Sequence, residues 1–491
     1  MFLFLFPVLQ KTSVELNISR SSIRRRREIV RMDHAQNVKE QFKGSASLVV
    51  HWDGKLLPDL CGKELVDRLP VIVSGVGVNQ LLGVPKLGSG TGEAQASAVA
   101  QLLSEWGLVD RVGGMCFDTT ASNTGRRNGA CVLLEQKLDK DMLHFACRHH
   151  IFEVVLGGVF KESLGMSSGP DIAIFKRFQQ NWQFIDQRNY ETGASLAATA
   201  SCKYRVIAFA ECQLKLCQPR DDYREFLELT IIFLGGIPPR GVHFCAPGAM
   251  HHARWMAKAL YTFKIWMFRS QFSLTGREEK GLRDVCLFLI TVYLEAWFTA
   301  PVAAAAPRND LELIQRLAMY EQENATLCKI ACNKFAGQLW YLSEELVGLA
   351  FFDNAISTPM KRDMLKALGE REGVEEPLKR IQLDINKAAG MIIPDFVTKN
   401  TITFFRRLRI PCDFLEADPE SWGDREDYKH GLETVKDLKV VNDNAERGVA
   451  LIEEYNSLIT KNEEQKQYLL QIVQDHRHRF PDCNKAQLMN H

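Results

Sequence analysis

The chain has 491 residues, more than one simple core usually fills, so two or three domains or one domain with a large insertion are expected. Its composition is that of a globular protein, with 46% hydrophobic and 25% charged residues. The formal net charge of +1 excludes a uniformly basic nucleic-acid-binding protein but is compatible with a local basic patch.

Cysteine usage and the amino end bear on the cellular compartment. The 13 cysteines are odd in number, scattered and without the spacing of a disulfide framework, so we expect reduced thiols in the cytosol or nucleus. Residues 1–9 form an apolar run, but no basic residue precedes it, no small-residue cleavage site follows it, and it is too short to span a membrane. We therefore expect no signal peptide and no membrane partner, and a start inside a longer ancestral reading frame.

Residues 1–45 are predicted to form a basic helical lead-in. Its dense cluster is Arg24, Arg25, Arg26 and Arg27, in a segment where residues 1–50 hold nine Lys and Arg against four Asp and Glu. A solvated helix face explains such a cluster. A nuclear localisation patch or a set of contacts to DNA phosphates also explains it, and these alternatives stay open.

Residues 46–160 alternate between strand and helix signals in a way that is typical of an α/β layer. Strands are predicted where short apolar runs end at turn residues, and helices where apolar residues recur every three or four positions. The predicted strands are 46–52, 70–78, 81–87, 113–117 and 143–147, and the predicted helices are 93–106, 129–138 and 151–160.

Residues 161–430 change character, because strand signals are few and helical periodicity dominates between Gly-Pro, Pro-Pro and Ala/Pro-rich breaks. We predict a long helical block over this range. Residues 431–491 are predicted to be closing helices, the last of them near 463–478, followed by a polar tail. The expected fold class is α/β, a mixed sheet interrupted by a large α-helical insertion.

Two acidic residues end predicted strands: Asp53 follows the first and Asp118 follows the fourth. A carboxylate at the end of a buried strand is unfavourable unless something pairs with it, and a divalent cation is one such partner. An aspartate before Gly-Lys can instead be a turn residue, and one before Thr-Thr can cap a helix. In a ribonuclease-H-like sheet, strands one and four are neighbours, so the two carboxylates there point at one site.

Three further elements extend this pattern into a family resemblance. They are Cys147-Arg-His-His150, His252-Ala-Arg-Trp255 and Asn444-Ala-Glu-Arg-Gly-Val449. In this order, and preceded by Asp53 and Asp118, they resemble the motifs of hAT-type DNA transposases, which are members of the DDE group with a ribonuclease-H-like fold. The resemblance covers about residues 45–460 of the chain.

The resemblance implies a catalytic site. Glu446 would be the third acid, and Asp53, Asp118 and Glu446 would hold two Mg²⁺ or Mn²⁺ ions for cleavage and strand transfer of DNA phosphodiester bonds. Residues 161–430 would be the family's insertion domain, lying between the two parts of the ribonuclease-H-like domain, 46–160 and 431–491. Without the resemblance, Glu446 would be interpreted as a solvated acid on a charged helix.

Other residues receive supporting roles. Cys147 is interpreted as a buried thiol at a strand end, and His150 as the donor of a hydrogen bond that positions the active-site backbone. As zinc ligands they would supply only two of the four that a structural site needs. By resemblance, Trp255, beside Arg254, would contact DNA and offer a surface on which an extruded base stacks, whereas its default interpretation is a core residue.

Three hypotheses for function follow. The first is a nuclear, transposase-like enzyme whose partners are DNA and a second copy of the chain, and intact acids at all three positions favour it. The second is a domesticated or decayed transposase remnant that binds partners and cuts nothing, which the missing zinc-finger domain favours. The third is an unrelated cytosolic α/β enzyme, in which the three acids do not converge.

Overall fold

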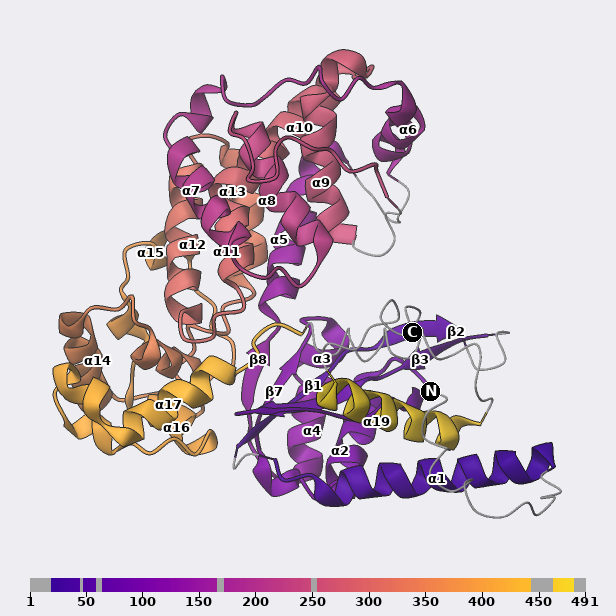
Figure 1. Cartoon of the computed structure of the whole chain (residues 1–491). Helices are drawn as coiled ribbons and strands as arrows, with labels where there is room; N and C mark the ends of the chain where they lie inside the picture. Colours follow the sequence, from indigo (N-terminus) through magenta and orange to yellow (C-terminus); the bar gives the residue numbers. More distant parts are fainter. Residues whose placement is uncertain are drawn as a thin grey trace.

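The lower part of the molecule in Figure 1 is built on a five-stranded mixed sheet. The computed structural model describes residues 19–44, 47–58, 64–165, 172–248, 254–442 and 462–480. The strand order is β5-β4-β1-β7-β8, with bounds β1 Leu48–Trp52, β4 Val71–Gly75, β5 Val78–Gly83, β7 Val112–Phe117 and β8 Leu143–Ala146. The pairs β5–β4 and β4–β1 are antiparallel, and the pairs β1–β7 and β7–β8 are parallel.

Strands β1 and β7 are the buried centre of this sheet, and every residue in both strands is buried. Each has a neighbouring strand on both sides, which suits their nearly continuous apolar runs. Glycine is required within β7, because a Cβ on Gly113 would lie 2.1 Å from the carbonyl oxygen of Arg407. Two adjacent, fully buried strands thus form the interior of the sheet.

The predicted strand over residues 70–78 is wrong at its end, because the chain reverses within it. Gly75 pairs with Val78 across a two-residue turn in which Gly77 has a φ of +67°, a value that glycine adopts readily. A second sheet was not predicted. It has the order β2-β3-β6 and consists of β2 Lys55–Pro58, β3 Leu65–Arg68 and β6 Lys86–Leu87. Leu56 and Leu65 are exposed, so these short strands lack a buried apolar run that would mark them.

The α-helices of the described residues have the following bounds. They are α1 Arg20–Gln41, α2 Gly92–Glu105, α3 Ala121–Thr124, α4 Ala130–Leu138, α5 Arg148–Leu164, α6 Ala173–Asn181, α7 Lys203–Leu214, α8 Asp221–Phe233, α9 Arg254–Met267, α10 Gly276–Phe288, α11 Leu294–Thr299, α12 Ala306–Tyr320, α13 Ala325–Ala336, α14 Thr358–Glu370, α15 Ile385–Ala388, α16 Ile402–Arg407, α17 Glu426–Asp437 and α19 Glu463–Arg479.

Helices cover the antiparallel part of the sheet on both faces. Leu470 of α19 packs in a small cluster with Ile72 and Leu81, whereas Val73 and Leu82 belong to the main core together with α2 and α4. Because successive side chains of a strand point to opposite faces, α19 and the α2–α4 pair lie on opposite sides of the sheet. Helix α1 then packs along α19 (Figure 1).

Helix α19 also satisfies the edge strand β5. Gln467, Gln471 and Gln474 lie at helical spacing and donate from their amides to carbonyl oxygens at Val84, at Leu81 and Leu82, and at Asn79. The amide oxygens of Gln467 and Gln474 accept from the backbone N–H groups of Val84 and Leu81. These side chains pair backbone groups that an edge strand otherwise leaves open to another chain.

The long interval after β8 is helical, as predicted. Helix α5 runs from the sheet into an upper block with α7 to α13, and a smaller group around α14, α16 and α17 lies beside the sheet (Figure 1). Among the described residues of 161–430 the only β pairing is an isolated bridge between Leu339 and Ile381. The chain leaves and rejoins the sheet at one place, because the backbone N–H of Arg148 donates to the carbonyl oxygen of Val440 at 3.0 Å.

A buried ion pair fixes α5 where it leaves the sheet. Nη1 of Arg148 lies 2.7 Å from Oδ1 of Asp310 on α12, and both side chains are almost fully buried. Burial raises the pKa of Asp310 to about 6, and the Arg148 charge opposes this shift. Tyr341 packs against the guanidinium and donates its hydroxyl hydrogen bond to the carbonyl oxygen of Ala146 in β8. The junction thus joins the helical block to the end of the sheet.

His51 makes the stability of the sheet depend on pH. It is fully buried in β1, where burial, with the charge of Lys439, lowers its pKa to about 3. The unfolded chain therefore binds a proton between pH 6.5 and 3 that the folded chain does not, and stability falls as the pH is lowered through this window. One such group contributes up to about 1.4 kcal/mol per pH unit.

We predict that His51→Gln reduces this acid sensitivity, since glutamine keeps a polar partner for Ser74, 2.7 Å from Nε2, but cannot titrate. Urea unfolding at pH 7.5 and pH 5 should show a smaller loss of unfolding free energy for the variant than for the wild type. The same substitution at the exposed His430 is the control. Equal losses in wild type and His51→Gln would contradict the assignment.

Candidate active site

The two predicted aspartates lie at the carboxyl ends of neighbouring parallel strands. In the β1–β7 ladder His51 pairs with Cys116, so Asp53 and Asp118 follow the paired strands at the same edge of the sheet. Both line a cavity of about 140 Å³. The other lining residues are Cys147, His149, His150, Glu153, Arg220, Tyr223, Trp255, Trp297 and Asn442. The predicted adjacency of the two strands is confirmed, and Cys147, His150 and Trp255 meet the aspartates in one place.

Asp118 is held by its own loop. Its Oδ1 accepts hydrogen bonds from the backbone N–H and the hydroxyl of Thr120, at 3.0 and 2.6 Å, and from the amide of Asn123 at 2.6 Å. Its Oδ2 accepts none from the described residues. The N-cap residue of the short helix α3 is Thr120, so Asp118 is not itself the cap. One carboxylate oxygen is thus fixed, and the other is left for the cavity.

Asp53 lies in the link between β1 and β2 and is half-buried, as expected both for a turn residue and for a cavity wall. The residues before the two aspartates stack on each other, with 5.9 Å between the ring centres of Trp52 and Phe117. The indole N–H of Trp52 donates to Oδ1 of Asn123 at 2.9 Å, and Asn123 in turn donates to Asp118. Trp52 therefore couples the ends of the two strands.

The four consecutive residues from Cys147 to His150 each contact a different part of the structure. The Cys147 thiol accepts a hydrogen bond from the backbone N–H of Asn442 at 3.2 Å. Arg148 pairs with Asp310, and the His149 ring stacks on Trp297 with 3.7 Å between ring centres. His150 lies on the cavity wall. Cys147 is buried at the strand end, as predicted, and no disulfide bond joins the described cysteines.

The pKa of His150 depends on the acidic side chains at the cavity. Burial by itself lowers the pKa of His150, but the hydrogen bond to Glu153 and the negative charges of Glu153, Asp118 and Asp53 outweigh it. The net effect is a raised pKa. Nδ1 of His150 lies 3.5 Å from Oε2 of Glu153, one helical turn further along α5. His150 was predicted to donate a hydrogen bond that positions the active-site backbone, whereas the contact that the structure describes is with the Glu153 side chain.

Aromatic rings from four helices form a second wall. Trp297 of α11 lies between His149 of α5 and Trp255 of α9, with 3.7 and 3.6 Å between ring centres. Tyr223 of α8 meets both tryptophans at its edge. One side of the Trp255 ring is therefore occupied within the protein, as its interpretation as a core residue expects, and the half-buried remainder lines the cavity.

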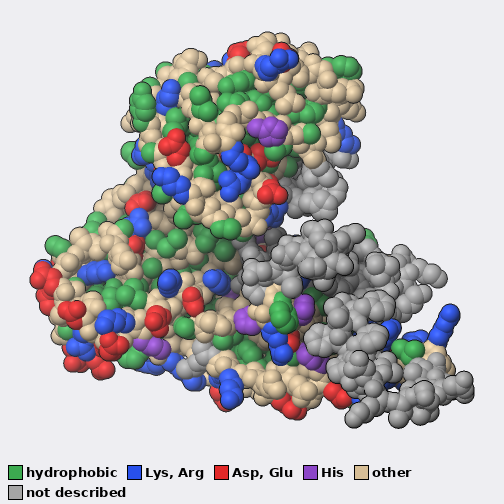
Figure 2. All heavy atoms as spheres, viewed as in Figure 1, with side chains coloured by type: hydrophobic (Ala, Val, Ile, Leu, Met, Phe, Trp, Pro, Cys, Tyr) green, Lys and Arg blue, Asp and Glu red, His purple; other side chains and the backbone are tan. Residues whose placement is uncertain are grey.

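Several predicted residues cannot be placed at the site. Glu446 and His252 lie outside the described residues, and nothing is described of the Arg254 side chain beyond its place at the start of α9. Arg24, Arg25, Arg26 and Arg27 are exposed on α1, and none of them lines the cavity. Figure 2 shows basic and acidic side chains intermingled over the face in view, as the small net charge leads one to expect.

The oxygen atoms at the cavity are of the chemical type that a hard metal cation binds. No three His, Cys, Asp or Glu side chains form a metal-binding group within the described ranges. The cavity nevertheless holds two aspartate carboxylates and the amide oxygen of Asn442, a buried atom without a hydrogen-bond partner in the described structure. Carboxylate and amide oxygens are ligands that Mg²⁺ and Ca²⁺ take.

Sequence reasoning missed Glu153, Arg220, Tyr223, Trp297 and Asn442. Glu153 had a local signal, because it lies three residues after His150 in a helix and so on the same face. Asn442 lies shortly before the predicted Glu446 motif. Arg220 and Tyr223 lie together at the start of α8 and Trp297 lies on α11, and no local signal joins either helix to the two aspartates. Only their packing brings them to the cavity.

No protein-family model matches the chain, and no curated protein matches its sequence. None of the helices in the described part of the chain has the length and apolar character of a membrane span. The candidate site therefore stands on its own geometry.

We predict that Glu153→Gln lowers the pKa of His150 more than Asp118→Asn does, because Glu153 supplies both a hydrogen bond and a charge. The histidine side-chain signals of the full chain, followed by NMR against pH, measure this, and His150→Gln identifies the signal among the 12 histidines. Asp110→Asn is the matched control, since Asp110 is exposed and precedes β7 at its other end. An unchanged His150 pKa in both test variants would mean that His150 does not respond to the charges of Glu153 and Asp118.

Proposed function

We propose that this protein is a transposase-like, DNA-acting protein of the hAT type, in which Asp53 and Asp118 hold divalent cations for phosphodiester chemistry. The observation that carries the proposal is their place at the ends of neighbouring parallel strands, lining one cavity. Glu446 is proposed as the third acid. A histidine, an arginine and several aromatic rings line the cavity beside the two acids. The basic side chains are suited to contact DNA phosphates, and the aromatic rings are suited to stack on bases.

The arrangement of the sheet supports a ribonuclease-H-like fold. Counted in chain order, β1 and β7 are the first and fourth strands of the large sheet, and they are adjacent. The helical interval starts at Arg148 and returns at Val440, which are joined by a backbone hydrogen bond, and residue 446 follows closely. This is the connectivity that an insertion between the second and third acids requires.

The chemistry needs little beyond positioning and charge. Bound Mg²⁺ or Mn²⁺ ions would activate a water or 3′-hydroxyl and stabilise the leaving oxygen. Asp118 is pre-positioned by Thr120 and Asn123. Arg220 brings a guanidinium to the cavity wall, where it lies 5.5 Å from the Tyr223 ring centre and pairs with Asp222, and a phosphate is a suitable further partner.

Space for a substrate continues beyond this cavity. A larger one, of about 650 Å³, shares His149, Tyr223 and Trp297 with it. Lys439 lines this second cavity together with amide side chains such as Gln213 and Gln218. We propose that the exposed arginines of α1 contribute phosphate contacts elsewhere on the surface, that a second copy of the chain takes part, and that the protein acts in the nucleus.

We predict that Mn²⁺ stabilises the wild type against thermal unfolding, because a ligand that binds only the folded state adds about 2.7 kcal/mol at a hundred times its dissociation constant. Asp118→Asn should abolish this gain and should also abolish nicking of generic DNA. Asp110→Asn, the same change at the other end of β7, should alter neither.

The alternative outcomes are distinct. A wild type with no Mn²⁺ effect and no nicking would favour a remnant that binds partners without catalysis. A stabilisation that survives in Asp118→Asn would mean that the cation binds elsewhere.

A further inference from the structure

Asn442 enters the cavity from the segment that returns to the sheet. It is 7% exposed, and two hydrogen bonds hold it. Its backbone N–H donates to the Cys147 thiol, and its Nδ2 donates to the carbonyl oxygen of Trp52 at 2.7 Å. A carbonyl can only accept, so the amide group has one orientation. Its Oδ1 then faces away from Trp52 and accepts no hydrogen bond from any described residue.

Such an atom is unfavourable unless something binds it. A buried carbonyl oxygen without a donor loses its hydration and gains nothing in return. The cavity that Asn442 lines also contains Asp53 and Asp118. Three oxygen-bearing side chains thus meet in one small space, and one of their oxygens has a defined orientation and no partner among the described residues.

We propose that Asn442 is a cation ligand, supplying a neutral oxygen to the divalent ion that Asp53 and Asp118 bind. The proposal rests on the proposed function and adds a residue to it. A hard cation accepts amide oxygens together with carboxylates, and a neutral ligand adds coordination without further repulsion between the two aspartates. The ligand class is therefore a divalent cation of the Mg²⁺ or Mn²⁺ type.

The surrounding hydrogen bonds hold all three ligands relative to one residue. Trp52 is covalently bonded to Asp53, its carbonyl oxygen orients Asn442, and its indole holds Asn123, which donates to Asp118. A set of ligands fixed in this way suits a cation, whose affinity depends on ligand geometry as well as on charge.

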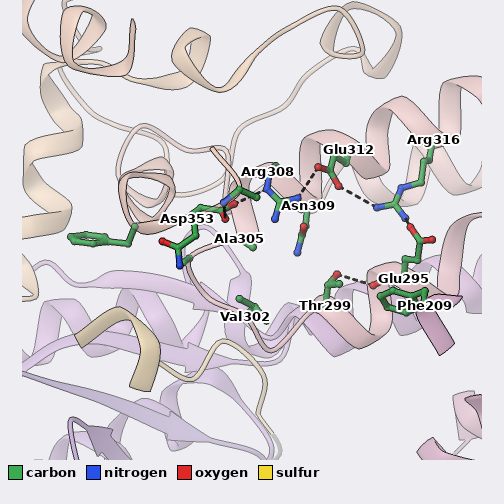
Figure 3. A pocket seen from close by; sticks show the side chains of 14 residues that line it. Phe209, Glu295, Thr299, Val302, Ala305, Arg308, Asn309, Glu312, Arg316 and Asp353 are labelled. Carbon is green, nitrogen blue, oxygen red and sulfur yellow. Dashed lines mark hydrogen bonds and ion pairs between the residues drawn. The ribbon is translucent and has the colours of Figure 1, made fainter. Parts of the chain in front are cut away.

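Asn309 offers a matched control in another cavity. It is 5% exposed, and its Nδ2 has no hydrogen-bond partner in the described structure. It lines a cavity of about 440 Å³, in which Arg308 pairs with Glu312 and Asp353, and Arg316 pairs with Glu295 (Figure 3). In this cavity the carboxylates near the asparagine are already paired with arginines, so it lacks the donors that a cation needs.

The test is the affinity of the full chain for Mn²⁺, measured by calorimetry. Asn442→Asp should bind at least about tenfold more tightly, and Asn442→Leu at least about tenfold more weakly, because ligand charge and number set cation affinity. Asn309→Asp and Asn309→Leu should leave the affinity unchanged. A merely structural role through Trp52 would weaken binding in both Asn442 variants, or in neither, and either result overturns the proposal.

A second variant keeps the test open if Asn442→Leu does not fold. Asn442→Cys should increase the Cd²⁺–thiolate absorption above the baseline that the 13 cysteines of the wild type set, and adding Asp118→Asn should reduce this increase. No increase over the wild type would overturn the assignment of Asn442. If Asp118→Asn abolishes Mn²⁺ binding while the Asn442 variants behave as wild type, only this inference fails. If the wild type binds no Mn²⁺, the proposed function fails as well.

Discussion

The hydrogen bonds of Trp52 hold the candidate active site together. Its indole N–H reaches Asn123 and through it Asp118, its carbonyl oxygen binds Asn442, and its ring stacks on Phe117. The side chain is fully buried, so water does not compete for these bonds. Loss of one partner from a buried hydrogen bond costs about 1–3 kcal/mol. The relative positions of the strand ends and of the returning segment therefore depend on one residue.

The first turn of α5 plays the corresponding part between the sheet and the helical block. Consecutive residues there bind the returning segment, Asp310, Trp297 and Glu153. The buried Arg148–Asp310 pair is the most demanding of these contacts, because removal of one partner leaves a charge in the core and costs about 3–5 kcal/mol. In return, the helical block supplies an entire wall of the cavity. The sheet alone would present the two aspartates without the aromatic rings or Arg220.

The sheet itself is completed by distant parts of the chain. The glutamines of α19 pair backbone groups of the edge strand β5. Asn442 donates a hydrogen bond to the carbonyl oxygen of Trp52 at the carboxyl end of β1. All five strands of the large sheet precede the helical interval, but the cover of β5 and the contribution of Asn442 to the candidate site come from residues that follow it. Such an arrangement is expected where a long insertion separates, along the sequence, the residues that form one site.

The sequence by itself determined the strands β1, β7 and β8, the helical character of the long interval and the two aspartates that end strands. These features are local, since an apolar run or a helical period is visible within a few residues. It left the small second sheet unseen, because Leu56 and Leu65 are exposed and mark no buried run. Tertiary structure alone decided which helices wall the cavity, that one side of Trp255 is covered, and that Asn442 lies beside the aspartates. Such facts depend on packing between residues hundreds of positions apart, and no local pattern encodes that packing.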